Sequence, residues 1–116
     1  MDYIKKAEMI ALWAQEKNAT DIDIIDVTEL TSVTDVFVFM SAANERQVDA
    51  INEHIYVQAK TAEFNIPSVE GKKERRWVLL DFGDVVVHIF HHEEREYYDI
   101  EKLWADGKFI LLPDRK

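Results

Sequence analysis

The sequence predicts a single α/β domain in which a mixed sheet of about five strands carries helices on its faces, in the order αββαβββα. Three observations predict this class. Apolar residues recur every three or four positions in several segments, as on the buried side of a helix. Runs of β-branched and aromatic residues lie between these segments and are typical of strands. A strand, a long helix and another strand follow one another, which favours a crossover and some parallel pairing.

The first half of the chain is predicted to form two helices with two strands between them. The four segments are residues 2–17 (helix), 22–27 (strand), 35–41 (strand) and 44–64 (helix). Asp2 is a suitable N-cap for the first helix. Asn44 and Gln47 have the spacing of a capping box, which indicates where the long helix begins. The second strand is apolar at nearly every position, so we expect it to be central and covered on both faces.

The second half is predicted to form a short strand, a hairpin and a last helix. The segments are residues 66–70 (strand), 77–81 and 84–90 (hairpin strands) and 92–104 (helix). Phe82 and Gly83 connect the two hairpin strands, and a short loop with glycine is typical of a β-hairpin. Glu93 and Glu94 fall in the first turn of the last helix, where acids are favourable. We place the domain at residues 1–106 and expect residues 107–116 to be a loosely attached C-terminal tail.

Composition excludes several classes of protein. The chain has 116 residues, of which 47% are hydrophobic, and it has no cysteine. A disordered chain, a disulfide framework and a cysteine nucleophile are therefore excluded. No apolar run approaches the ~20 residues of a membrane helix, and charged residues interrupt the N-terminus where a signal peptide would be apolar. We expect a soluble cytoplasmic protein without a membrane partner.

The charge of the chain is negative and uneven. Fourteen basic and 23 acidic residues give a formal net charge of −9. Residues 77–106 hold eight acids against two bases, whereas residues 60–76 hold five bases against three acids. A domain this acidic repels phosphate backbones, so we expect little or no direct nucleic-acid binding. The charge either serves solubility or steers the protein toward a basic partner.

Two groups of residues are candidates for catalysis or metal binding. Asp21 and Asp23 resemble the paired carboxylates that hold Mg²⁺ in nucleotidyltransferases, but no Gly-Ser turn precedes the long helix to bind phosphates. His88, His91 and His92 are close in sequence, but a strand alternates its side chains, so His91 points away from the face of His88. We therefore predict no metal, no cofactor and no catalytic residue. A small metal-dependent nucleotidyltransferase-like enzyme using Asp21 and Asp23 remains an alternative.

Aromatic residues concentrate in the hairpin and the last helix, with acids between them. The six aromatics are Trp77, Phe82, Phe90, Tyr97, Tyr98 and Trp104. Such a mixture is typical of protein interfaces, where aromatics serve as anchors, and also of a hairpin core. Trp77 and Leu79 share one face of their strand, while Val78 and Leu80 share the other. The hairpin strand therefore has two apolar faces, of which helices cover one and something else must cover the second.

The same segments resemble the ribosomal silencing factor family, also called RsfS or Iojap-like. The resemblance is carried by residues 77–90, 95–104, 31–38, 46–51, 69–71 and 19–27. It covers about residues 19–104, and the hairpin with the last helix is its most specific part. One departure is Ser41-Ala42, where the family usually has a Ser-Gly step.

The resemblance implies a translation repressor and not an enzyme. It implies a nucleotidyltransferase-like fold without the catalytic residues. It also implies binding to the large ribosomal subunit through ribosomal protein fourteen of that subunit. The bound factor would block joining of the small subunit in starvation or stationary phase. Carried over to this chain, the contact residues would be Glu70, Trp77, Leu79, Asp81, Tyr98, Asp99 and Trp104. The aromatics would act as anchors and the acids would pair with Lys or Arg. A homodimerising adaptor is a further alternative.

Overall fold

The computed structural model describes residues 2–98 and 105–110, with the backbone alone for residues 96–98. Three helices and six strands make up this part of the chain. In chain order they are α1 (Tyr3–Glu16), β1 (Thr20–Asp26), β2 (Val36–Ala42), α2 (Glu45–Thr61), β3 (Ser68–Glu70), β4 (Trp77–Asp81), β5 (Val85–His91), α3 (His92–Tyr98) and β6 (Lys108–Ile110). The described helices include none that is long and apolar enough to span a bilayer.

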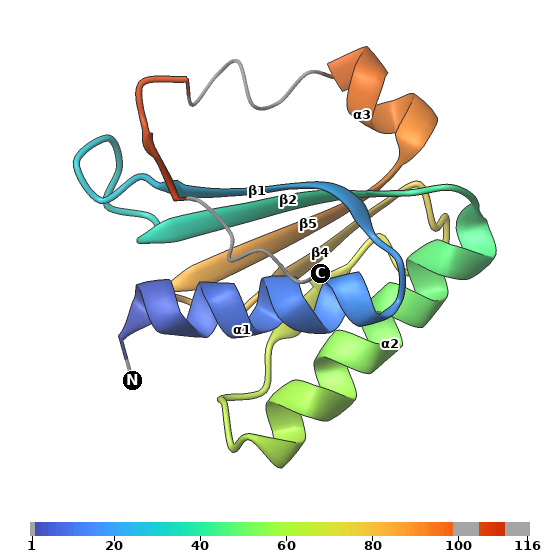
Figure 1. The fold of residues 1–116 in the computed structure, drawn as a ribbon, viewed down its shortest axis with the longest axis horizontal. Helices are drawn as coiled ribbons and strands as arrows, with labels where there is room; N and C mark the ends of the chain where they lie inside the picture. The colour runs from blue at the N-terminus through green and yellow to red at the C-terminus, as the bar shows by residue number, and fades with distance from the viewer. Residues whose placement is uncertain (1, 99–104, 111–116) are drawn as a thin grey trace.

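The six strands form one mixed sheet in the order β3-β4-β5-β2-β1-β6 (Figure 1). β2 and β5 lie parallel at the centre, and the other neighbours are antiparallel. The parallel pair requires a crossover, which α2 supplies together with β3 and β4. The predicted α/β class with a mixed sheet is therefore confirmed. The nucleotidyltransferase-like relationship stays a prediction.

The sixth strand lies in the segment that the sequence predicts to be a loose tail. Residues 108–110 pair with β1, and Ile110 lies opposite Ile24 and packs against the core. The sequence predicts about five strands and assigns residues 107–116 to a tail, and it does not anticipate this short strand. The reason is that β1 has an edge left over after pairing with β2, and a three-residue strand leaves no periodic signal in the sequence.

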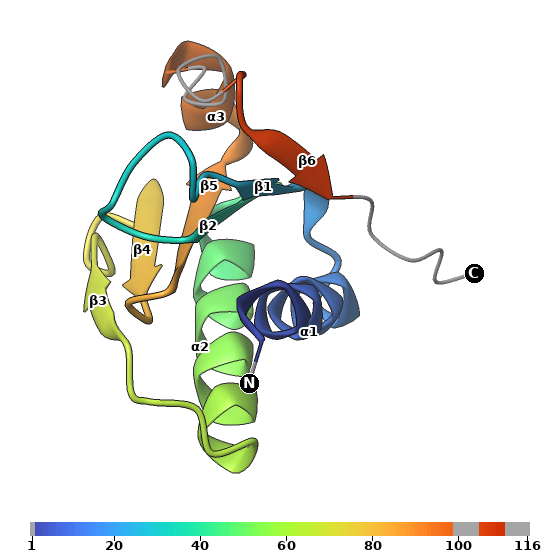
Figure 2. The ribbon, with the colours of Figure 1, turned by 90° about the vertical axis from the view of Figure 1, so that its left-hand side faces the viewer.

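α1 and α2 lie on one face of the sheet and α3 lies on the other (Figure 2). The core beneath α1 and α2 contains the fully buried residues Ile10, Val38, Met40, Ile51, Ile55, Leu80 and Ile89. A smaller buried cluster on the opposite face contains Ile25, Val27, Phe39 and Phe90. β2 contributes to both clusters, as expected for a central strand. The smaller cluster underlies the candidate site.

The helix starts agree with the predicted caps. Asp2 Oδ1 accepts a hydrogen bond from the Ile4 N–H at 3.2 Å, and Asn44 Oδ1 accepts one from the Gln47 N–H at 2.9 Å. α2 ends at Thr61, three residues before the predicted end, because Glu63 adopts a left-handed φ of 65° that ends the helix. The predicted last helix, residues 92–104, is described to Tyr98, and residues 99–104 lie outside the described part.

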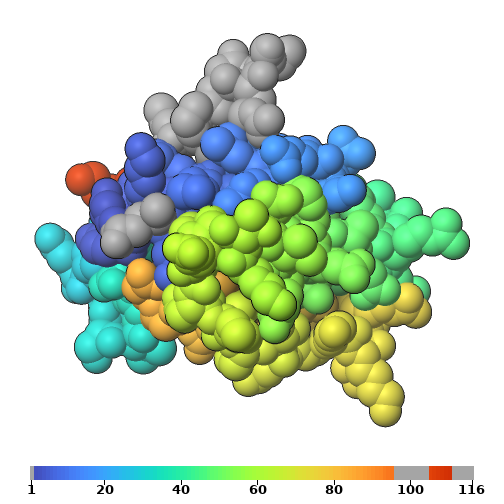
Figure 3. Space-filling view, turned by 90° about the horizontal axis from the view of Figure 1, so that it is seen from below, coloured from blue at the N-terminus to red at the C-terminus, as the bar shows by residue number. Residues whose placement is uncertain are grey.

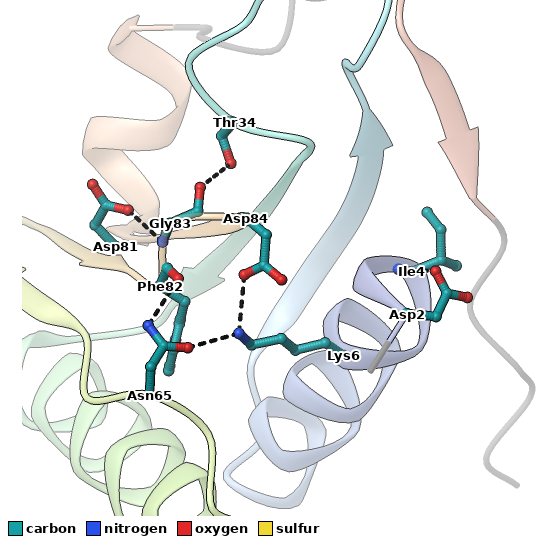
Figure 4. A network of polar contacts seen from close by, with 9 residues as sticks. All are labelled: Asp2, Ile4, Lys6, Thr34, Asn65, Asp81, Phe82, Gly83 and Asp84. Carbon is teal, nitrogen blue, oxygen red and sulfur yellow. Dashed lines mark hydrogen bonds and ion pairs between the residues drawn. The ribbon is translucent and has the colours of Figure 1, made fainter.

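One buried lysine connects α1 to the hairpin turn (Figure 4). The Lys6 ammonium donates to Asp84 Oδ1 and to Asn65 Oδ1, each at 2.9 Å, and its side chain is 8% exposed. The Asn65 amide donates to the Phe82 carbonyl oxygen at 2.9 Å. The ammonium also lies 5.1 Å from the centre of the Phe64 ring. These contacts fix the β4–β5 turn, which borders the candidate site.

Candidate partner-binding face

Four of the seven predicted contact residues come together on the face of the sheet opposite α1 and α2. We call this surface the outer face and define it by Glu70, Trp77, Leu79 and Asp81. Glu70 of β3 lies directly opposite Leu79 of β4. Trp77, Leu79 and Asp81 alternate along β4, so all three point away from the two long helices. The prediction that Trp77 and Leu79 share one face of this strand is therefore confirmed, and the use of that face as a contact surface stays a prediction.

The remaining three predicted residues belong to the end of the last helix. Tyr98 is the final residue of α3, and its backbone alone is described. Asp99 and Trp104 lie outside the described residues. α3 itself lies on the same side of the sheet as the outer face (Figure 2). The assignment of Tyr98, Asp99 and Trp104 to the contact surface stays a prediction.

The outer face has an apolar centre and an acidic margin. Trp77 and Leu79 are half-buried, whereas Glu70 and Asp81 are exposed. An apolar patch bordered by charge is the usual composition of a recognition surface. Two carboxylates beside it favour a partner that carries Lys or Arg.

A histidine on the neighbouring strand fixes the position of the Trp77 ring. The Trp77 Nε1–H donates to His88 Nδ1 at 3.0 Å. The Trp77 ring also packs on Phe90, with 4.9 Å between ring centres, and Phe39 stacks on the His88 ring at 4.9 Å. The indole therefore has a defined orientation before any partner binds, which lowers the entropic cost of using it as an anchor.

His88 is suited to this role because it stays neutral. Burial lowers the pKa of His88 to about 4, and the nearby charge of Asp81 only partly opposes this effect. Since Nδ1 accepts from Trp77, we assign the ring proton to Nε2. That nitrogen is buried and has no hydrogen-bond partner among the described residues. A neutral ring costs far less to bury in this position than an imidazolium.

Asp81 has a local structural role in addition to its exposed carboxylate. Its Oδ1 accepts a hydrogen bond from the Gly83 N–H at 2.8 Å, and Gly83 has the left-handed φ of 92° that glycine accommodates without strain. The Thr34 hydroxyl donates to the Gly83 carbonyl oxygen at 3.0 Å from the opposite side. Asp81 therefore stabilises the hairpin turn, which sequence reasoning did not anticipate.

Arg76 holds the start of α3 near the edge of the outer face. Its guanidinium donates to Glu94 at 3.1 Å and to Glu93 at 3.0 Å. These hydrogen bonds raise the pKa of Arg76, and the one to Glu93 lowers the pKa of that carboxyl. Glu93 and Glu94 therefore have a cationic partner in Arg76, the residue that precedes β4. They also lie in the first turn of α3, where acids are favourable.

Arg95 fixes α3 to the strands and also bears on the alternative enzyme hypothesis. Its guanidinium donates to Asp23 Oδ2 at 3.1 Å and to the Ser41 hydroxyl at 3.0 Å. Asp23 is therefore held in an ion pair, while Asp21 is exposed with a left-handed φ of 50°. The described residues contain no group of three or more potential metal ligands. This geometry does not favour the Asp21/Asp23 enzyme.

Sequence reasoning missed two further residues near the outer face. Phe37 on β2 is half-buried and meets the His88 ring edge-on at 5.4 Å. Val33 is 81% exposed in the β1–β2 loop, next to Thr34, which bonds the hairpin turn. The alternation of Phe37 with buried Val36 and Val38 is the one signal that places it on this face.

Comparison with known proteins assigns the chain to a family. The sequence model described as "Ribosomal silencing factor during starvation" matches residues 1–116. The chain belongs to the ribosomal silencing factor family. Ribosomal silencing factor RsfS of Bacillus subtilis (strain 168) is 41% identical over 105 residues, which cover 90% of this chain and 89% of that protein. The resemblance found in the hairpin and last helix is thereby confirmed.

Relatives in organelles and two crystal structures extend the comparison. Chloroplastic Iojap of Zea mays is 36% identical, covering 92% of this chain and 46% of that protein. The Mus musculus protein named "Mitochondrial assembly of ribosomal large subunit protein 1" is 33% identical, covering 88% of this chain and 46% of that protein. A Chromobacterium violaceum protein has the same fold, with a TM-score of 0.88 at 31% identity, covering 99% of this chain and 95% of that one. A Bacillus halodurans protein gives 0.82 at 32% identity, covering 93% and 98%.

Proposed function

We propose that this silencing factor binds the large ribosomal subunit through ribosomal protein fourteen of that subunit and prevents the small subunit from joining. Translation would be repressed in starvation or stationary phase. The single observation that carries the proposal is the outer face, where Trp77 and Leu79 form an apolar centre beside Glu70 and Asp81. The name of the mouse relative, which refers to assembly of the large subunit, supports the choice of subunit.

The chemistry of the outer face matches a basic protein partner. The pre-oriented indole of Trp77 supplies a large apolar contact, and such anchors commonly carry most of the binding energy of an interface. Glu70 and Asp81 would pair with Lys or Arg of the partner. With a net charge of −9, the factor is attracted to a basic protein and repelled by the surrounding rRNA. Tyr98, Asp99 and Trp104 would extend the contact from the side of the last helix.

Repression by this route requires no catalytic chemistry and no cofactor. A folded domain bound at the junction between subunits excludes the small subunit by its volume alone. The hydrogen bonds that hold the hairpin turn and α3 make the domain rigid. The small subunit could therefore displace it only by breaking its contacts with the large subunit. We therefore expect no nucleotide turnover with Mg²⁺ or Mn²⁺.

The proposal is tested by sedimentation with isolated ribosomal subunits in a sucrose gradient. The factor should migrate with large subunits and not with free small subunits. A binding assay with isolated ribosomal protein fourteen then identifies the contact. Migration with small subunits, or no binding to protein fourteen by a factor that still binds large subunits, would contradict the proposed partner.

Salt provides a second test of the electrostatic part of the contact. Raising ionic strength from about 0.1 M to about 1 M shortens the Debye length from roughly 10 Å to roughly 3 Å. We expect binding to weaken over this range, mainly through slower association, because the carboxylates act at long range. An affinity that does not change with salt would argue against steering by these acids.

A second copy of this chain is the competing occupant of the outer face. A homodimer that buries Trp77 and Leu79 would hide the same surface in the free protein. Analytical ultracentrifugation over a range of concentrations distinguishes the two cases. A dimer that forms in the wild type and is absent in Leu79→Glu would mean that self-association uses the outer face. Ribosome binding would then compete with self-association, and the apparent affinity of the factor for the ribosome should fall as the factor concentration rises.

A further inference from the structure

A groove lies on the other side of the molecule, between α2 and the β3–β4 turn. It encloses about 880 Å³ and is lined by Asn52, Tyr56 and Val57 of α2 together with Val69 of β3. Lys72 and Lys73 form its rim. Figure 3 views the molecule from the side of α1 and α2, where the yellow segment that contains this turn lies beside the green α2. The groove shares no lining residue with the outer face.

The groove contains a buried acceptor without a donor. Asn52 is 6% exposed, and its Oδ1 has no hydrogen-bond partner among the described residues. Leaving such an acceptor unpaired costs about 1–3 kcal/mol. Buried side-chain acceptors are satisfied in most proteins, so this one points to a donor other than those that the described residues supply. A backbone N–H of an added peptide is a donor of the required kind and reaches Oδ1 once the Asn52 amide, which lines the groove, rotates toward it.

The rim of the groove is positively charged in an otherwise acidic protein. Lys72 and Lys73 form no ion pair with any residue in the described ranges, whereas Arg75 is paired with Asp49 at 3.1 Å. The turn that carries the lysines is closed by a hydrogen bond from the Arg75 N–H to the Gly71 carbonyl oxygen at 3.1 Å. The two exposed lysines therefore give the groove a cationic margin suited to carboxylates.

The floor and one wall of the groove suit an extended chain. Within the described part of the chain, β3 is the last strand on its side of the sheet, so one of its edges has no neighbouring strand. Val57 of α2 is 50% exposed and lines the same groove as Val69 of β3, where it offers apolar contact. A strand added to β3 would place its alternate side chains against α2 and its backbone along the edge.

From these observations we propose that the groove binds an acidic peptide segment in extended conformation, alongside β3. Its carboxylates pair with Lys72 and Lys73, a backbone N–H donates to Asn52, and apolar side chains contact Tyr56 and Val57. The groove is a second interaction surface, independent of the proposed ribosome contact. A peptide fits better than RNA, because a peptide backbone can continue the hydrogen bonding of the sheet at the open edge of β3, which a sugar-phosphate backbone cannot do.

The test is an NMR titration of the full-length ¹⁵N-labelled protein with capped hexapeptides. The probes alternate valine with glutamate, serine or lysine. The glutamate peptide should shift the Asn52 side-chain amide and the backbone amides of Val69 and Lys73, with the serine and lysine peptides at least tenfold weaker. Shifts confined to the outer face, equal binding of the three peptides, or no shift at millimolar peptide would overturn the proposal.

Two variants and one control assign the binding to the groove. Lys72→Glu combined with Lys73→Glu should weaken binding of the glutamate peptide at least tenfold. Asn52→Leu, which keeps the side-chain size but removes the acceptor, should weaken it at least threefold with a melting temperature no lower than that of the wild type. Trp77→Ala should leave peptide affinity unchanged, since that residue lies on the outer face. Tighter binding of a single-stranded RNA octamer than of the glutamate peptide would favour nucleic acid and refute the assignment.

Discussion

Lowering the pH should destabilise this protein through one buried histidine. The pKa of His88 is about 4 in the folded protein, because the ring is buried, against an ordinary value of about 6.5. Between these two values the unfolded chain binds a proton that the folded protein does not. Stability from this group is therefore complete above the unfolded pKa and is lost as pH falls from 6.5 toward 4. The loss amounts to about 2 kcal/mol at pH 5 and about 3 kcal/mol at pH 4.

Urea unfolding at pH 7.5 and pH 5 measures this effect directly. His88→Gln removes the titrating ring and retains an acceptor for the Trp77 indole. Between pH 7.5 and pH 5, this variant should therefore lose about 2 kcal/mol less of its free energy of unfolding than the wild type loses. Equal pH dependence in wild type and His88→Gln would refute the reasoning, because it would mean that burial does not disfavour the protonated ring.

Three further predictions separate folding from binding. Asp81→Ala should cost about 1 kcal/mol of stability by losing the turn hydrogen bond, whereas Asp81→Asn keeps an acceptor, melts like wild type and still weakens partner binding. Asp84→Ala should destabilise the fold by at least about 2 kcal/mol, because it removes the counter-charge of buried Lys6, and Lys6→Met should cost less; equal costs in chemical unfolding would contradict this ranking. Trp77→Ala should lower the free energy of unfolding by about 2 kcal/mol, which is less than the 3–5 kcal/mol of a fully buried tryptophan. It should also cost at least about 2 kcal/mol in binding to the partner. A melting temperature that collapses in this variant would assign Trp77 to the core.

Local patterns predicted the elements that build the outer face. Residues 77–81 form β4 with the predicted bounds, and strand alternation correctly placed Trp77 and Leu79 on the face opposite Val78 and Leu80. The helix caps at Asp2 and Asn44 were also correct. These features depend on residues close in sequence, so a single chain suffices to predict them.

Contacts between distant segments were not predictable in the same way. Lys6 belongs to the charged N-terminal helix, and its burial depends on Asp84, which is 78 residues away. The His88–Trp77 hydrogen bond depends on the register of β4 and β5, which no local pattern specifies. β6 is recognisable only once β1 is known to have an open edge. In each case the decisive neighbour is set by the tertiary fold.

Subunit joining, measured on a sucrose gradient, tests the central claim most directly. Wild-type factor, added to large subunits before small subunits, should reduce the peak of joined ribosomes. Leu79→Glu places a charge at the centre of the outer face and should leave that peak intact. Ile66→Glu makes the same change at a residue that is 70% exposed in the loop between α2 and β3, so it should act like wild type. Full inhibition by a folded Leu79→Glu variant would contradict the assignment of the outer face as the ribosome contact.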